Sequence, residues 1–192
     1  GEDILDVPLG KFINYQQVPV HFFPRFSPSI HALREFAFSR ELTIWLWENI
    51  RNYDLLHIHA IFSYAPSIAM AIARCQKVPY IVTVHGLLCE WSLQQKELKK
   101  KLYLKLLEKA NLNHSQSVHF TSIAEQKEAS PLNLTSSSFV LPLGIYPPQK
   151  ILNTRERLKK HLNIPIDEPI ILFLSRLHPK KGLDYLIPAL GK

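Results

Sequence analysis

The chain has 192 residues, 46% of them hydrophobic and 20% charged, which is an ordinary globular composition with enough apolar residues to bury a core. No apolar run approaches the roughly 20 residues of a membrane-spanning helix. The two cysteines cannot build a disulfide framework, which favours a reducing, cytoplasmic setting. A net charge of +7 predicts a polyanionic partner, such as nucleic acid, an anionic membrane face or a phosphorylated substrate.

Short apolar runs alternate with helical patterns along most of the chain. The opening segment, residues 3–29, is rich in Val, Phe and Pro and predicts irregular strand and loop. Strands are predicted where apolar and β-branched residues run together, at 53–60, 78–86, 117–122, 138–144 and 170–175. Helices are predicted from apolar residues at helical spacing, at 32–49, 66–75, 93–110, 123–130, 155–162 and 183–190.

This alternation predicts an α/β fold with a doubly wound parallel sheet. The proline-rich segment 146–169, with its single amphipathic helix, indicates a domain junction. We therefore expect a first domain over residues 1–147, a linker and helix over 148–168, and the first strand and helix of a second domain over 169–192.

Small or polar residues follow nearly every predicted strand. Ligands of open parallel sheets bind beyond the carboxyl ends of the strands, so these residues are candidates for a site. They are His57 and His59, His85 and Gly86, Thr121 and Ser122, Gly144, and Ser175 and Arg176.

The loop after the last predicted strand carries the pattern R-x-x-x-x-K-G, formed by Arg176, Lys181 and Gly182. Arginine offers a planar fork for phosphate oxygens, and lysine a movable point charge. Glycine permits close approach of the backbone, and the amides of the helix start add partial positive charge. A pair of phosphates suits such a loop, and a solvated basic loop is the alternative.

The histidines at the strand ends have both a functional and a structural interpretation. His85, followed by Gly86, suits the positioning of a sugar hydroxyl or the polarisation of a leaving group; a packed, hydrogen-bonded histidine is the alternative. His57 and His59 are two residues apart and point to one face of their strand. No carboxylate or thiol stands beside them in the sequence, so a site wall or core position is favoured over a metal site.

The predicted helix 93–110 holds six lysines and two glutamates, a formal charge of +4. A solvated helix face is the default interpretation, and contact with anionic lipid head groups is the sharper one. Nucleic-acid binding is disfavoured because aromatic residues are not interleaved with the lysines. Its apolar stripe is formed by Leu98, Leu102, Leu106 and Leu107.

Four segments in order resemble family-4 glycosyltransferases, the retaining group with the GT-B fold. Residues 53–91 resemble the middle of that family's N-terminal domain. "VHFTSIAEQKEA" and "FVLPLGI" resemble two later segments of it, and "ILFLSRLHPKKGLDYLIPAL" resembles the opening of its C-terminal domain. The resemblance covers most of the chain beyond about Tyr53.

The resemblance implies that Arg176, Lys181 and Gly182 hold the diphosphate of a nucleotide-sugar, such as a UDP- or GDP-sugar. It implies that His85 is catalytic and, with Gly86, faces the transferred sugar. His59 and the following loop, with Phe62, Ser63 and Tyr64, would lie on the sugar and acceptor side. The acceptor would be a glycan or a lipid-linked glycan, as in polysaccharide biosynthesis, with no metal or cofactor.

The sequence also departs from the family pattern. The Gly-rich loop that opens the family's N-terminal domain and the Glu-x7-Glu element of its C-terminal domain are not found, so we expect a chain truncated at both ends. Leu143 and Tyr146 replace the Asn and Asp of the usual "PNGxD", and Ser175 stands where glycine is common.

Three hypotheses follow from these observations. The first is a piece of a retaining sugar transferase, cytoplasmic or peripheral at the inner membrane face, and inactive as this chain alone. The second is a truncated, non-catalytic remnant. The third is a basic α/β module that binds nucleic acid, although no specific nucleic-acid partner is predicted.

Overall fold

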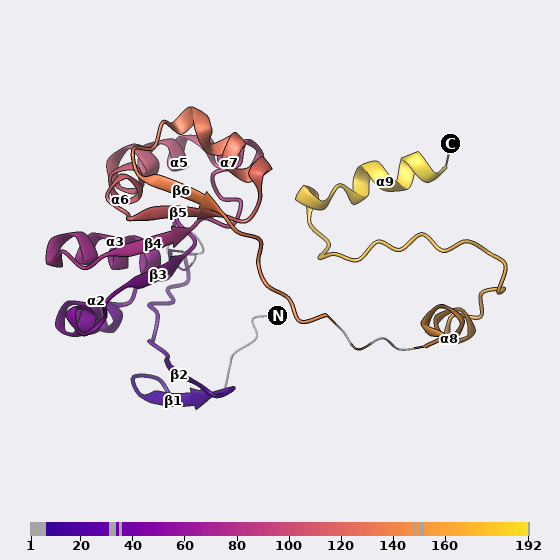
Figure 1. Cartoon of the computed structure of the whole chain (residues 1–192), viewed down its shortest axis with the longest axis horizontal. Helices are drawn as coiled ribbons and strands as arrows, with labels where there is room; N and C mark the ends of the chain where they lie inside the picture. The colour runs from indigo at the N-terminus through magenta and orange to yellow at the C-terminus, as the bar shows by residue number, and fades with distance from the viewer. Residues whose placement is uncertain (1–6, 31–33, 35, 148, 150–151, 192) are drawn as a thin grey trace. The chain divides into compact units, whose positions relative to one another are not determined.

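A computed structural model describes residues 7–30, 34, 36–147, 149 and 152–191. The chain divides into two compact units, Gly1–Leu143 and Gly144–Lys192, and each is described by itself (Figure 1).

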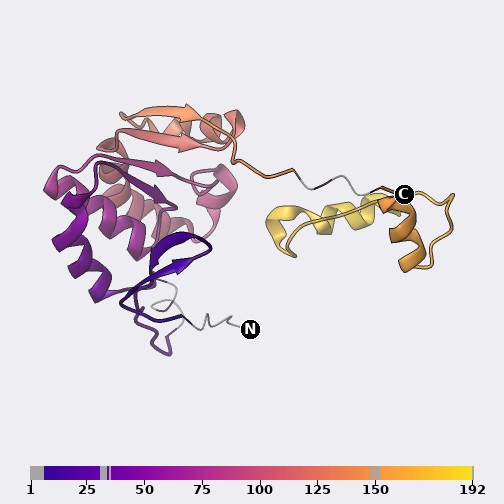
Figure 2. The ribbon, with the colours of Figure 1, turned by 60° about the horizontal axis from the view of Figure 1, so that its bottom comes forward.

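The first unit contains a four-stranded parallel sheet in the order β3-β4-β5-β6, formed by Leu56–His59, Tyr80–Thr83, Ser117–Phe120 and Ser137–Val140. The strands follow one another without a reversal of order, as in one half of a doubly wound sheet (Figure 2). Because such crossovers are right-handed, the connecting helices lie on the same side of the sheet. The predicted α/β class with a parallel sheet is therefore confirmed.

The two faces of this sheet differ in chemistry. One face buries apolar side chains beneath the connecting helices, and these side chains include Ile58, Tyr80, Val82, Val118 and Phe120. The other face carries polar and aromatic side chains in register: His59 pairs with Thr83, Thr83 with His119, and His119 with Phe139. The alternation of side chains along each strand produces this separation.

Three connections join these strands. Helix α3 (Tyr64–Gln76) links β3 to β4 and ends at Lys77, which has a left-handed φ of 61°. Helix α7 (Ile123–Ala129) begins after its N-cap Ser122 and is followed by the 3-10 turn η3 (Ser130–Leu132), where the predicted helix was expected to end. The remaining connection, between β4 and β5, is longer and consists of several helical segments rather than one helix.

That connection was predicted as one helix over 93–110, and the structure corrects this. Helix α4 (Glu90–Gln94) ends first, and Lys96 has a φ of 53°, which interrupts the helical path. A continuous helical run then extends through α5 (Glu97–Tyr103), the π-helix η2 (Leu104–Glu108) and α6 (Lys109–Asn113). In the part of the chain that the structure describes, no helix is both long and apolar enough to cross a bilayer.

The opening segment forms an antiparallel hairpin, β1 (Phe12–Tyr15) and β2 (Val18–His21). Helix α2 (Arg40–Asn49) follows, with Ser39 accepting a hydrogen bond from the Leu42 amide at 3.2 Å, and the 3-10 turn η1 (Ile50–Asn52) ends it. Residues 32, 33 and 35 of the helix predicted over 32–49 lie outside the described residues.

The second unit contains α8 (Thr154–His161), the 3-10 turn η4 (Pro179–Lys181) and α9 (Leu183–Leu190). Lys159 is buried in α8, and its ammonium group donates to the carbonyls of Pro165, Ile166 and Glu168, which fixes the turn after the helix.

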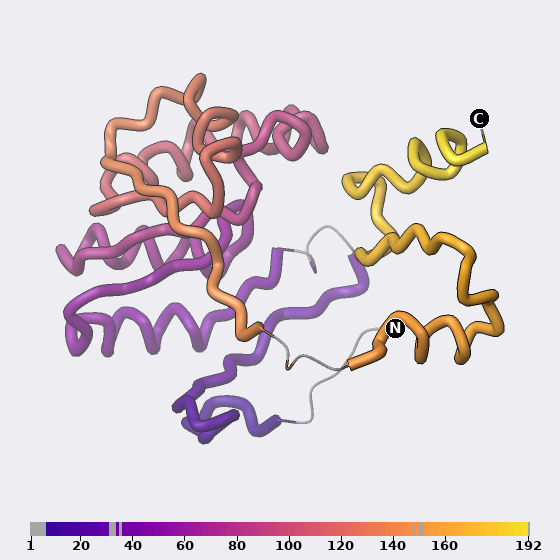
Figure 3. The backbone as a smooth tube through the Cα atoms, turned by 45° about the vertical axis from the view of Figure 1, so that its right-hand side comes forward, coloured from indigo at the N-terminus to yellow at the C-terminus, as the bar shows by residue number. Residues whose placement is uncertain are grey.

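The strand predicted over 170–175 is not formed among the residues that the structure describes. This segment is irregular backbone between α8 and α9 (Figure 3), and Leu174 is 88% exposed. The prediction was wrong because a β-strand requires a hydrogen-bonded neighbour, and apolar composition alone does not supply one.

Candidate functional site

Histidines from two adjacent strands meet at the carboxyl edge of the sheet. Nδ1 of His59, the last residue of β3, lies 2.9 Å from Nε2 of His85, which follows β4. The two rings stack with centroids 5.2 Å apart. Only one proton fits between the two nitrogens, so one imidazole donates and the other accepts. The contact fixes the orientation of both rings at the predicted site.

A hydrogen-bonded chain crosses the same face of the sheet. His57 Nε2 lies 2.7 Å from Thr83 Oγ1, and Thr83 Oγ1 lies 2.8 Å from His119 Nδ1. His119 Nε2 lies 2.6 Å from the carbonyl oxygen of Leu141. That carbonyl can only accept, so a neutral His119 donates to it and accepts from Thr83. Thr83 in turn accepts from His57, which assigns a direction to every bond in the chain.

This environment lowers the pKa of two of the histidines below the ordinary value of 6.5. For His57 the larger cause is burial, followed by the nearby imidazoles of His119 and His85. For His59 the order is burial, then His57, His85 and His119. The neutral form of both side chains is therefore favoured, and a neutral His57 can still donate to Thr83 through Nε2.

Glu125, on α7, ties the ends of β4 and β5 together. Its carboxylate accepts hydrogen bonds from the amide of Gly86, and from the amide and hydroxyl of Thr121 at 2.7 and 2.8 Å. Both His85 and Gly86 have left-handed backbone angles, with φ of 50° and 71°. The buried carboxylate holds this turn, and with it the position of the His85 ring.

Glu108 anchors the loop after β3, as Glu125 anchors the turn after β4. It lies in the π-helix, is fully buried, and its Oε1 accepts from the amide of Phe62 at 3.1 Å and from the hydroxyl of Ser67. Its Oε2 has no hydrogen-bond partner among the described residues. Burial raises the pKa of Glu108, although the hydrogen bonds from Ser67 and Phe62 oppose that shift.

Glu108 belongs to a wider buried network. Tyr103 donates to Ser67 at 3.0 Å, and Arg74 donates to the side chain of Asn111 at 2.8 Å. Tyr80 donates to the Asn111 carbonyl at 2.5 Å, and burial raises the pKa of Tyr80 to about 12. The network connects α3, β4 and the helical run 97–113, so the loop after β3 rests on a rigid base.

The other predicted residues of this unit are placed differently. Ser63 is the N-cap residue of α3, and its carbonyl accepts from the Ser67 hydroxyl at 2.8 Å. The Tyr64 hydroxyl lies 2.5 Å from Thr43 Oγ1, and its ring packs against Phe38. Tyr64 is thus committed to the contact with α2, whereas His59, His85 and Gly86 are brought together.

Arg176, Lys181 and Gly182 belong to the second unit. Arg176 and Lys181 are exposed, and Gly182 has a φ of 68° directly before α9. The His178 side chain accepts from the Lys180 amide at 3.2 Å, which shapes the turn η4. Gly182 therefore adopts a left-handed backbone conformation, which favours glycine, directly before a helix.

No group of three or more His, Cys, Asp or Glu side chains is arranged to hold a metal ion in the described part of the chain.

Residues 7–144 match the family model described as a glycosyl transferase 4-like domain. The chain belongs to the glycosyl transferase 4-like family. This span includes the whole sheet, the His59–His85 contact and both anchoring glutamates. The predicted family is confirmed.

A relative in Bacillus subtilis (strain 168) is named as a teichuronic acid biosynthesis glycosyltransferase, TuaC. It is 27% identical over 139 residues, which cover 71% of this chain. The match covers 34% of that relative, so the chain corresponds to about a third of its length.

Sequence reasoning missed four residues of the site: Thr83, Glu108, His119 and Glu125. The signal for Glu125 was present, because it stands three residues after Ser122 in the pattern of a helix N-terminus. Glu108 gave no such signal, since it lies among lysines in a helix that is charged on its outer face.

Proposed function

We propose that this chain is the acceptor-side part of a retaining GT-B glycosyltransferase that uses a nucleotide-diphosphate sugar. The observation that supports this most directly is the His59–His85 pair at the carboxyl edge of a glycosyl transferase 4-like sheet. In open α/β sheets this edge is where ligands bind. Glu108 and Glu125 pre-position the two loops that would contact the sugar.

In this proposal His85 is the catalytic residue and contacts the transferred sugar, with Gly86 beside it. His59 orients His85, and Ser63 and Tyr64 follow in the loop and helix start on the acceptor side. A neutral His85 would donate a hydrogen bond to a sugar hydroxyl while its Nε2 stays paired with His59.

Arg176, Lys181 and Gly182 are proposed to bind the donor diphosphate. One cation about 4 Å from a developing anion contributes roughly 4 kcal/mol at an effective dielectric of about 20. Two such cations would offset the charge of the leaving group without a metal ion, so we propose no cofactor.

The acceptor is proposed to be a glycan or a lipid-linked glycan of polysaccharide biosynthesis, by analogy with the name of TuaC. We place the reaction in the cytoplasm, at the inner face of the membrane. The positive net charge of +7 suits both a phosphorylated donor and an anionic surface.

The test is sugar transfer by a protein extended at both ends to the length of TuaC, with UDP- and GDP-sugars as donors. We expect His85→Ala, Arg176→Ala and Lys181→Ala each to lower kcat at least about a hundredfold. Lys180→Ala removes an equal charge from the same turn and is the matched control. We expect the 192-residue chain alone to show no transfer.

The anomeric configuration of the product, read by NMR, tests retention. Unchanged turnover in the His85 and Arg176 variants would refute the assigned roles. Transfer by the short chain would refute the need for further residues, and an inverted product would refute the retaining class.

A further inference from the structure

The helical run 97–113 has two apolar faces, and only one of them packs against the protein. The inward face carries Tyr103, Leu104, Leu107, Glu108 and Leu112, which are buried or half-buried. The outward face carries Leu98, Leu102 and Leu106, which are 85%, 58% and 70% exposed. Leu107, which was grouped with these three leucines in one apolar stripe, is half-buried on the inward face instead.

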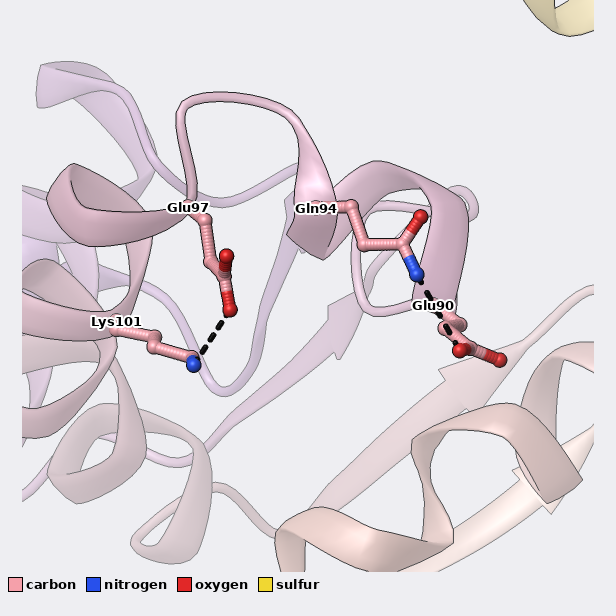
Figure 4. Close-up of polar contacts among 4 residues, drawn as sticks. All are labelled: Glu90, Gln94, Glu97 and Lys101. Carbon is pink, nitrogen blue, oxygen red and sulfur yellow. Dashed lines mark hydrogen bonds and ion pairs between the residues drawn. The ribbon is translucent and has the colours of Figure 1, made fainter.

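The outward leucines are spaced by four residues, so they form a row about 6 Å apart along the run. Four exposed lysines flank the row: Lys99, Lys101, Lys105 and Lys109. The acidic residue beside them is Glu97, which pairs with Lys101 at 2.5 Å (Figure 4). The outward face therefore has an excess of three positive charges around an apolar centre.

The preceding helix α4 is held by further contacts. Within α4, Gln94 donates to Glu90 at 3.3 Å (Figure 4). The Glu90 amide donates to Glu128 of α7 at 3.2 Å. Lys100, on the inward side, donates to the Ser92 carbonyl at 2.5 Å. These contacts anchor the start of the run, so its outward face is presented on a supported helix.

We propose that this outward face, Leu98, Leu102 and Leu106 with the flanking lysines, docks on an anionic lipid bilayer. An apolar row within a lysine-rich polar face is the pattern by which interfacial helices insert into the head-group region. The charge complementarity favours an anionic membrane over a second copy of this chain, since two such faces would repel each other.

Docking at this face would also set the distance between the candidate site and the membrane. The inward side of the same run bonds the Phe62 amide through Glu108, and Lys100 lies 5.5 Å from the Phe62 ring. The loop after β3 is therefore about one helix diameter, roughly 10 Å, from the docked surface. This extends the proposed function and rests on it: a lipid-linked acceptor would reach the His59 loop from the membrane.

The test is co-sedimentation of the 192-residue chain with vesicles of phosphatidylcholine, alone or mixed equally with phosphatidylglycerol. We expect binding to the mixed vesicles only. Combined Leu98→Ser, Leu102→Ser and Leu106→Ser should lower the partition coefficient roughly tenfold or more. Combined Lys99→Gln, Lys105→Gln and Lys109→Gln should lower it about fivefold per lysine at low salt.

Matched controls exist on the same unit. Leu9, Leu55 and Leu141 are 53%, 50% and 57% exposed, and their combined change to Ser should leave binding intact. The exposed lysines Lys11, Lys77 and Lys127, changed to Gln, control for net charge. Circular dichroism and urea midpoints equal to those of the parent would show that each variant is folded.

Absence of binding to the mixed vesicles would overturn the proposal, as would equal loss in the control variants. A dimer in solution that the outward Leu→Ser changes dissociate would assign the face to a second copy instead. Vesicle binding requires neither donor nor acceptor, so failure here is distinguishable from failure of sugar transfer.

Discussion

Replacement of Glu108 separates its role as an anchor from the cost of its buried charge. In Glu108→Ala, the Phe62 amide loses its acceptor, whereas the Ser67 hydroxyl retains the Ser63 carbonyl at 2.8 Å. An orphaned amide that is buried costs about 1–3 kcal/mol, the half-buried Phe62 amide lies toward the lower end, and the cavity left by the side chain adds to this cost. We expect the free energy of unfolding to fall by about 3 kcal/mol at pH 5.

Glu108→Gln keeps an acceptor for Phe62 but cannot ionise. Because burial raises the pKa of Glu108 in the folded state above its ordinary value of 4.5, the folded parent binds more protons than the unfolded chain above that pH. Parent stability therefore falls as pH rises through the shifted pKa, and the Gln variant lacks this component. We expect the Gln variant to gain stability relative to the parent between pH 5 and pH 8.

Urea unfolding of the parent and both variants at pH 5 and pH 8 measures these differences, with equal m-values as the check on two-state behaviour. Glu97→Gln, on the exposed side of the same run, is the control and should change stability by less than about 1 kcal/mol. A Gln variant that loses as much stability as the Ala variant at both pH values would refute the reasoning.

Two further predictions concern the carboxyl edge. Glu125→Ala removes the acceptor of the Gly86 amide, so we expect faster hydrogen exchange of that amide and a loss of about 2–3 kcal/mol of stability; unchanged exchange would contradict the anchoring role. The lowered pKa values of His57 and His59 mean that the unfolded chain binds more protons below the ordinary value of 6.5, so stability should fall as pH drops below 6.5. His59→Gln should reduce this fall in urea midpoints between pH 7.5 and 5.5, and an equal fall in the variant would contradict it.

The sheet was predictable because most of its strands either are continuously apolar or alternate apolar and polar side chains over their four residues. Local pattern places His59 and His85 at strand ends, yet their contact depends on the register of β3 against β4, where His59 pairs with Thr83. Register depends on which strands become neighbours, and no single segment contains that information.

The errors have physical reasons as well. Leu107 was grouped with the exposed Leu98, Leu102 and Leu106 in one stripe, but it lies on the inward face, which is completed by Glu108 and Asn111, both polar and buried. Periodicity finds an apolar stripe without telling whether protein covers it. The run 170–175 has strand composition, and the described residues provide it with no paired neighbour.

The π-helix η2 accommodates one additional residue within the helical run 97–113. Its Lys109 amide bonds to the Leu104 carbonyl five residues back, so this turn holds one residue more than an α turn. Deletion of one residue there would let this turn close as an ordinary α turn, so the chain beyond it would keep its rotation about the helix axis. Asn111 would then still meet Arg74 and Tyr80. Only a second deletion would rotate the chain beyond the turn by about 100° and separate Asn111 from both partners. An alignment gap of a single residue at this point is therefore compatible with an intact buried network behind an ordinary α turn.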